Sequence, residues 1–433
     1  LKAFRNIEIK SELFGSGTAN LSLHYGQGAA ESGNSAIYSI KAPVNLSEGY
    51  KFFTKCGFDG VEKVFAVITS LGVESDEMVV TLQGIQNKLN GYYALGSDID
   101  ASATAGWNDG FMPLGNNLSQ FTGSFDGLGH TITGLTTVQT DSDYVGLFGY
   151  VKGGDIRNLG IKDANITGKD RVGGLAGYMY ESNVRSCFVE GSVTGRNNIG
   201  GLAGYNNASS NISDSFSGGS VEGTSYIGGL VGYNRNNSSI DSSYSTCLVA
   251  STGEYAGGVV GRNSGTVTAS YWDTSTSGQT SSAGGTGVNT SQMQTLETFT
   301  GWDISAETEG PSTWYIDPGK DYPRLRAFLT FPDSSGGGES TPSSPANLPE
   351  PLLSAIRHIY GMARGTGEGT QPTMFRLYGP LNAKYAGQGS PPLFRVEGQG
   401  IRLPEGLPGI WDRFTSGFQG SSDPEQPAGQ GDE

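Results

Sequence analysis

Aspartates are the residues of this sequence with the clearest potential for chemistry. Two pairs have members two positions apart, and a fifth aspartate lies in FDGLGH; they are Asp98 with Asp100, Asp141 with Asp143, and Asp126. Because alternate residues of a strand point to the same face, each pair can present two carboxylates together. Paired carboxylates catalyse glycoside hydrolysis, and in loops they also bind a hard cation such as Ca²⁺.

Histidine and cysteine add no catalytic or metal-binding pattern. No zinc-ligand spacing, GxSxG elbow or P-loop occurs, and the three histidines are His24, His130 and His358. We expect His130 to be a turn or strand residue. The cysteines provide no disulfide framework, so we expect buried, unreactive thiols, with one pairing left open among Cys56, Cys187 and Cys247.

The aspartates do not recur near a cluster of basic residues. Polysaccharide-cleaving enzymes often combine clustered acids with basic residues on one face. Solvated loop carboxylates are therefore the favoured interpretation, and calcium binding by Asp141 and Asp143 is an alternative. We predict no catalytic residue, no cofactor and no metal, and hence a protein that is not an enzyme.

Composition limits the partners. The 433 residues include 69 glycines, only 16% are charged and 35% are hydrophobic, which is unlike an ordinary α/β enzyme. The formal net charge of −15 would repel nucleic acid and anionic membrane surfaces. Because of this charge we expect no nucleic-acid binding. No apolar run is long enough to span a bilayer, so we also expect no membrane insertion.

The elements that must position any site form a repeat. Five similar segments, VGLFGY, VGGLAGY, IGGLAGY, IGGLVGY and AGGVVGR, occur at 145–150, 172–178, 199–205, 227–233 and 256–262. Their central apolar residues recur every 27 to 29 positions: Leu147, Leu175, Leu202, Leu230 and Val259. We expect the accompanying glycines to provide φ > 0 or close backbone approach; these are Gly149, Gly177, Gly204, Gly232 and Gly261.

A second row lies between these segments, comprising Phe188, Phe216, Tyr244 and Tyr271. Each repeat thus contains two short β-type runs without helical periodicity, and it cannot bury its apolar face alone. Stacking the repeats as coils about 4.8 Å apart buries a continuous column. The sequence therefore predicts a β-solenoid in which both rows form interior ladders.

Two polar rows accompany the repeat. One is aromatic, with Tyr150, Tyr178, Tyr205 and Tyr233, and the other contains Asn206, Asn234 and Asn263. Stacked rings and amide hydrogen bonds along the axis would hold the coils together. Cohesion is the favoured interpretation of both rows, and a ligand-binding stripe is the alternative.

The GGLAG and GGLVG runs resemble the GLUG motif of large secreted bacterial proteins. Residues 82–102 and 121–135 look like the segment that precedes such repeats in filamentous-haemagglutinin-type exoproteins, and 271–285 with Trp302, Trp314 and 322–325 look like the segment that closes them. The resemblance implies a right-handed parallel β-helix, export by two-partner secretion through an outer-membrane partner, and adhesion or biofilm-matrix work.

These observations predict an all-β chain with a largely disordered C-terminal tail. Residues 1–95 are expected to form degenerate coils with one helical turn near 82–89, residues 96–272 the β-helix with its GLUG-type repeats at 145–262, and 273–332 a closing segment. A Gly/Ser/Pro linker is expected at 333–351 and a low-complexity tail with one short helix at 352–433.

The function we predict is a secreted or cell-surface bacterial adhesin or scaffold. Its elongated β-helix would bind carbohydrate or a host or matrix protein. Two alternatives are a carbohydrate-active enzyme on the same fold and a purely structural spacer.

Overall fold

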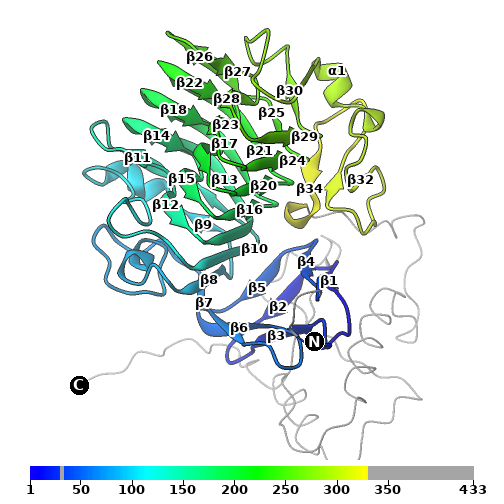
Figure 1. The fold of residues 1–433 in the computed structure, drawn as a ribbon. Coiled ribbons are helices and arrows are strands. Elements are labelled where there is room, and N and C mark those ends of the chain that lie inside the picture. The colour runs from blue at the N-terminus through cyan, green and yellow to red at the C-terminus, as the bar shows by residue number, and fades with distance from the viewer. Residues whose placement is uncertain (30–33, 330–433) are drawn as a thin grey trace, which may run out of the picture. The chain divides into compact units, whose positions relative to one another are not determined.

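The computed structural model describes residues 1–29 and 34–329. The predicted linker and tail, with the short helix, lie outside the described residues. Within them the fold is the predicted all-β parallel β-helix: successive coils stack with their strands paired in parallel, as the ladder of green arrows in Figure 1 shows.

Each coil of the repeat contributes strands to three sheets. The first sheet contains β14 (Asp170–Gly173), β18 (Asn197–Gly200), β22 (Ser225–Gly228) and β27 (Ala256–Gly257). The second contains β12 (Phe148–Lys152), β15 (Ala176–Tyr180), β19 (Ala203–Asn207), β23 (Val231–Asn234) and β28 (Val260–Asn263).

The third sheet is the largest, and two runs of each coil belong to it. Its strands in the β-helix are β8 (Tyr92–Leu95), β9 (Ile99–Asp100), β10 (Ser124–Thr133), β11 (Thr136–Val138), β13 (Asp155–Thr167), β16 (Asn183–Arg185), β17 (Phe188–Thr194), β20 (Asn211–Ser213), β21 (Phe216–Gly223), β24 (Ser239–Asp241), β25 (Tyr244–Ser245), β26 (Leu248–Ser251), β29 (Thr266–Thr268), β30 (Tyr271–Asp273) and β31 (Thr286–Val288).

The predicted leucine ladder lies in the interior. Its members are fully buried and belong to one hydrophobic core that runs through the coils: Leu147, Leu175, Leu202, Leu230 and Val259. The associated glycines are explained by close approach rather than by positive φ. A Cβ on Gly177 would lie 2.6 Å from the backbone nitrogen of Val145 in the preceding coil, and one on Gly232 would lie 2.6 Å from the carbonyl oxygen of Gly204.

The second row is in register, but the prediction that it faces the interior is wrong. Cys187 and Val189 belong to the interior core, whereas Phe188 between them packs in a separate cluster with Phe216, Tyr244 and residues of the closing segment. Neighbouring strand residues alternate between faces, so the row points outward. Its rings are parallel, with centroids 4.8 and 4.9 Å apart from Phe188 through Phe216 to Tyr244.

The closing segment covers this outward row. It contains α1 (Thr290–Met293), η3 (Leu296–Thr298), β32 (Ile304–Ser305), β33 (Trp314–Tyr315), β34 (Arg324–Leu325) and η4 (Arg326–Phe328). Trp302 and Trp314 lie 4.8 Å apart over Tyr244, whose hydroxyl donates to the Pro323 carbonyl at 2.7 Å. The segment therefore packs along the flank of the third sheet, and Tyr271 at the end of the row contacts Phe299.

The amino-terminal strands form most of a second, smaller core, to which Ala94, Leu128 and Ala327 also belong. The strands are β1 (Ile7–Ile9), β2 (Leu13–Gly15), β3 (Leu21–Tyr25), β4 (Tyr38–Ile40), β5 (Val44–Leu46), β6 (Gly49–Cys56) and β7 (Lys63–Ile68), and β6 pairs with β7 in antiparallel fashion. The helical turn predicted near 82–89 is confirmed as the 3₁₀ helix η1 (Gln83–Asn87); a second one, η2, follows at Ser102–Gly106. Among the described residues no helix is long and apolar enough to cross a membrane.

Candidate functional site

The predicted acid pairs do not meet in a common site. Asp98 and Asp100 are both exposed, but each has partners of its own. Asp98 accepts from the backbone nitrogen of Thr131 at 2.7 Å and lies 3.4 Å from Nδ1 of His130, whereas Asp100 accepts from the backbone nitrogen of Ser102. The bond with His130 is the first cause that holds the pKa of Asp98 below its usual value.

His130 itself connects two parts of the fold. It is buried, and its Nε2 lies 3.0 Å from the carbonyl oxygen of Val44 in β5, so that ring nitrogen donates to the amino-terminal strands. Both ring nitrogens thus face protein acceptors. His130 is a residue of strand β10, and its side chain links β10 to β5.

Asp126 is fully buried and forms part of a second link to the amino-terminal strands. Its carboxylate accepts from Arg157 Nε at 2.9 Å, from the Tyr38 hydroxyl at 2.7 Å and from Asn158 Nδ2 at 2.9 Å. The guanidinium of Arg157 also lies 4.3 Å from the centre of the Tyr38 ring. Every one of these partners is a protein group, so the carboxylate joins β4 to β10 and β13.

Asp143 forms an ion pair with Arg171, in which Oδ2 of Asp143 lies 3.2 Å from Nη1 of Arg171. Asp141 is exposed. No group of three or more His, Cys, Asp or Glu side chains in the described residues could hold a metal ion. The three cysteines are free thiols, and Cys56 is only partly buried. Burial raises the pKa of Cys187 to about 12 and that of Cys247 to about 11, which makes both thiols unreactive at neutral pH.

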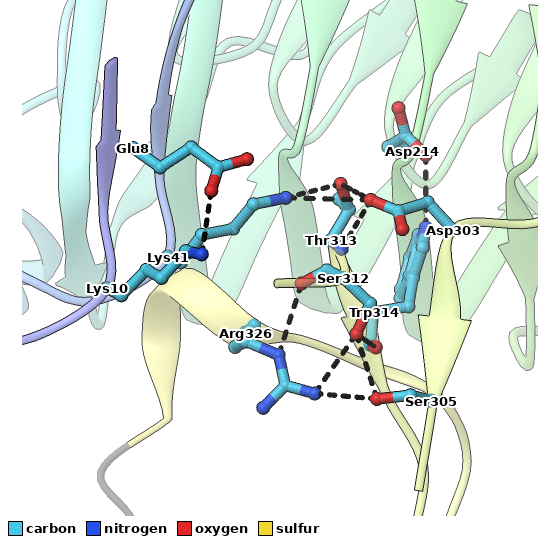
Figure 2. A network of polar contacts seen from close by, with 10 residues as sticks. All are labelled: Glu8, Lys10, Lys41, Asp214, Asp303, Ser305, Ser312, Thr313, Trp314 and Arg326. Carbon is cyan, nitrogen blue, oxygen red and sulfur yellow. Dashed lines mark hydrogen bonds and ion pairs between the residues drawn. The ribbon is translucent and has the colours of Figure 1, made fainter. Parts of the chain in front are cut away.

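A small cavity of about 100 Å³ lies where the amino-terminal strands, the coils and the closing segment meet, and Lys41, Arg185 and Asp214 line it. Figure 2 shows how Lys41 and Asp214 are held: Lys41 Nζ lies 2.7 Å from Thr313 Oγ1 and 3.7 Å from Asp303, and Trp314 Nε1 donates to Asp214 at 3.1 Å. Ligand pockets usually enclose several times this volume. The contacts around this cavity therefore hold the amino-terminal strands, the coils and the closing segment together.

Asp214 should be destabilising at neutral pH. Burial is the main cause that raises the pKa of this carboxyl, so the folded state favours its protonated form. Stability from this group is then greatest below the ordinary carboxyl pKa of about 4 and is lost as the pH rises through the higher folded pKa. We expect Asp214→Asn, which retains the acceptor for Trp314 and suits the left-handed backbone (φ 47°), to raise the urea midpoint at pH 7.

The gain should shrink when the same urea titrations are made near pH 4. Asp109→Asn, at an exposed position, is the matched control and should change neither midpoint. A lower midpoint for Asp214→Asn at pH 7 would show that attraction to Lys41 outweighs the burial of Asp214.

The tyrosine row forms a continuous ladder on the outer face of the second sheet. Tyr150, Tyr178, Tyr205 and Tyr233 are paired in register, and their successive ring centroids are 4.6, 5.0 and 5.0 Å apart. Tyr205 is buried, whereas the other three are half-buried. The predicted row of contacting rings is present, but only Tyr178 and Tyr205 stack face to face; the first pair is tilted and the last is T-shaped.

The asparagine row is the buried counterpart on the same strands. Asn206 Nδ2 donates to Asn234 Oδ1 at 2.8 Å, and Asn234 Nδ2 donates to Asn263 Oδ1 at 2.9 Å, which confirms amide hydrogen bonds along the axis. Asn206 and Asn234 are fully buried. This row holds the coils together, and its two buried members, Asn206 and Asn234, are out of reach of a ligand.

A second group of aromatic residues extends the tyrosine ladder. Tyr226 stacks on Tyr233 with centroids 5.9 Å apart and on Tyr255 at 5.1 Å, and both Tyr226 and Tyr255 have left-handed backbones (φ 61° and 64°). Arg262 occupies the ladder position after Tyr233, and its guanidinium carbon lies between 5.2 and 5.4 Å from the rings of Tyr226, Tyr233 and Tyr255. We call Tyr150, Tyr178, Tyr205, Tyr226, Tyr233, Tyr255, Arg235 and Arg262 the tyrosine–arginine surface.

The sequence-based analysis missed four members of this surface: Tyr226, Tyr255, Arg235 and Arg262. A signal for the tyrosines was present, since Tyr144, Tyr226 and Tyr255 each directly precede the first apolar residue of a repeat. Arg262 was missed because it replaces tyrosine in the fifth repeat. The alignment of the repeats already places Arg262 at the tyrosine position, and the register of β23 and β28 shows that it continues the ladder.

Comparison with known proteins gives a motif and two partial relatives. The GLUG motif matches residues 223–246. Halomucin of Haloquadratum walsbyi is 42% identical over 112 residues, which are 23% of this chain and 1% of that protein. A protein of Evansella cellulosilytica described as a Gly-rich membrane protein is 36% identical over 111 residues, 24% of this chain and 13% of that protein. The chain thus spans a small part of either relative.

A solved structure from Bacteroides ovatus, described as an immunoglobulin A1 protease, is 21% identical; the match covers 48% of this chain and 66% of that chain at a TM-score of 0.38. The GLUG motif and the β-solenoid, together with the partial relatives, fit a surface or secreted β-helix protein.

Proposed function

We propose that this chain is an adhesive or scaffold segment at a bacterial cell surface, and that its tyrosine–arginine surface binds carbohydrate or protein. One contrast carries the proposal. The closing segment covers the outward aromatic row from Phe188 to Tyr271. The described segments leave most of the other tyrosines partly exposed: Tyr150, Tyr178 and Tyr233 of the second sheet are half-buried, and Tyr255 beside the first sheet is 49% exposed. Large exposed aromatic surfaces on soluble proteins commonly mark interaction sites.

The side chains of this surface suit a hydroxyl-rich partner. Tyrosine offers an apolar ring and a hydroxyl that both donates and accepts, so a row of tyrosines can bind a sugar or a peptide without large conformational cost. The ladder repeats once per coil, and a polymer with regularly spaced groups could contact several coils at once. Export by two-partner secretion and work in a biofilm matrix belong to the same proposal.

We propose binding rather than catalysis because the acids are engaged elsewhere. Asp126 is buried with Arg157, Asp143 is paired with Arg171, and Asp98 is held by His130 and Thr131. No two carboxylates of the predicted set share a partner in the described residues.

A binding screen tests the proposal. The full chain should bind to at least one glycan or matrix protein in an array, and the double variant Tyr178→Ser with Tyr233→Ser should weaken that binding about tenfold by removing two contact rings. Tyr50→Ser is the matched control, since Tyr50 is 52% exposed outside this surface, and it should bind like the unchanged chain. Absence of binding across the array would instead favour the structural spacer.

A further inference from the structure

We propose that Arg235 and Arg262 make one end of the tyrosine–arginine surface a binding site for an acidic polysaccharide, whose chain carries carboxylate or sulfate groups. The inference rests on the proposed function and specifies its ligand. Both arginines lie close to the Tyr233 ring, with the guanidinium carbons of Arg235 and Arg262 6.0 and 5.2 Å from its centroid. Both side chains are exposed.

The positive charge of these two residues is not neutralised within the described part of the chain. Three other arginines of the coils have acidic partners: Arg157 has Asp126, Arg171 has Asp143, and Arg196 has Asp170. Within residues 1–29 and 34–329, the side chains of Arg235 and Arg262 hydrogen-bond to tyrosine hydroxyls. Two cations without acidic partners near one tyrosine ring, in a chain of net charge −15, indicate an anionic ligand.

The donors of both guanidiniums remain largely available. Each guanidinium has five N–H groups; Arg262 donates one hydrogen bond to the Tyr226 hydroxyl at 3.2 Å, and Arg235 donates one to the Tyr205 hydroxyl at 3.2 Å. The remaining donors form the planar fork that binds carboxylate or sulfate oxygens with two parallel bonds. The tyrosine hydroxyls accept from arginine and keep their own protons for donation to a ligand.

The surroundings also hold the arginines in place before binding. The Arg262 guanidinium lies among three tyrosine rings, and its backbone is fixed by the pairing of β28 with β23. A preordered charged group loses less conformational entropy on binding. The neighbouring ring edges and hydroxyls, repeated along the ladder, match the alternating apolar faces and hydroxyls of a sugar chain better than they match an acidic peptide.

The test is a set of affinity measurements on the full chain with immobilised polygalacturonate, chondroitin sulfate, neutral dextran and polyglutamate. We expect binding to at least one of the two acidic polysaccharides, weakened by added salt because charge attraction is screened. Comparing the carboxylated with the sulfated polymer identifies the acidic group. Arg262→Ala and Arg235→Ala should each weaken binding about tenfold, the loss expected when a charge-assisted contact is removed.

Arg5→Ala is the matched control, because Arg5 is exposed in the amino-terminal strands and its removal changes the net charge equally. It should bind like the unchanged chain, and far-ultraviolet circular dichroism should show that all three variants retain the fold. An equal loss in Arg5→Ala, or binding to polyglutamate alone, would overturn the inference. Binding to neutral glycans or matrix proteins without acidic polysaccharides would overturn it while leaving the proposed function intact; no binding to any partner would overturn both.

Discussion

Replacing Leu202 by aspartate is expected to lower the free energy of unfolding by about 4 kcal/mol or more, the combined cost of a lost apolar contact and a buried charge. Leu202 is fully buried in the middle of the interior ladder, between Leu175 and Leu230. A carboxylate at this position would have apolar neighbours in the coils on both sides. Urea unfolding followed by circular dichroism measures the loss.

The matched control is Leu118→Asp, because Leu118 is 86% exposed. This variant should unfold within about 0.5 kcal/mol of the unchanged chain, as surface substitutions usually do. Equal stability of the two variants would show that Leu202 does not face the core.

The second large effect is expected at the buried ion pair. Arg157→Met should cost about 3 to 5 kcal/mol, because it leaves the carboxylate of Asp126 buried without its cation. The same change removes the contact of Arg157 with Tyr38 on β4. We therefore also expect limited proteolysis to cut the amino-terminal strands faster than in the unchanged chain.

Arg196→Met provides the comparison for this prediction. Arg196 also pairs with an aspartate of the preceding coil, at 2.6 Å from Asp170, but its side chain is 54% exposed. Solvent screens exposed ion pairs, so the loss here should be much smaller than for Arg157→Met. If both arginine variants lost the same stability, burial would not be the reason for the importance of Arg157.

The sequence predicted the coils well because their period is a local property. Residues such as Leu175 and Leu202 recur with flanking glycines, and any β-solenoid that stacks these repeats must align them. The direction of the Phe188 row was harder to predict. Cys187, Phe188 and Val189 are all apolar, so alternation cannot show which of them face inward, and the covering tryptophans are more than 110 positions away in the chain.

The polar contacts were outside the reach of sequence reasoning for a similar reason. Asp126 appeared as a lone acid, and its partner Tyr38 lies 88 positions away. The tyrosine ladder itself was visible as a row of similar residues. The role of Arg262 was not, because the aligned repeats place it after Tyr233 without showing that its guanidinium contacts the rings of Tyr226 and Tyr255.

The in-register ladders also bear on how such a chain can change length during evolution. Each coil of the repeat contacts the one before it through the same kinds of residues as it contacts the one after, as Leu175, Leu202 and Leu230 do. A duplication of one whole repeat would therefore insert an extra coil, about 4.8 Å thick, that fits its neighbours without a new interface. Gene duplication and unequal recombination could thus adjust the reach of the molecule and the number of tyrosines that it displays in single, equal steps.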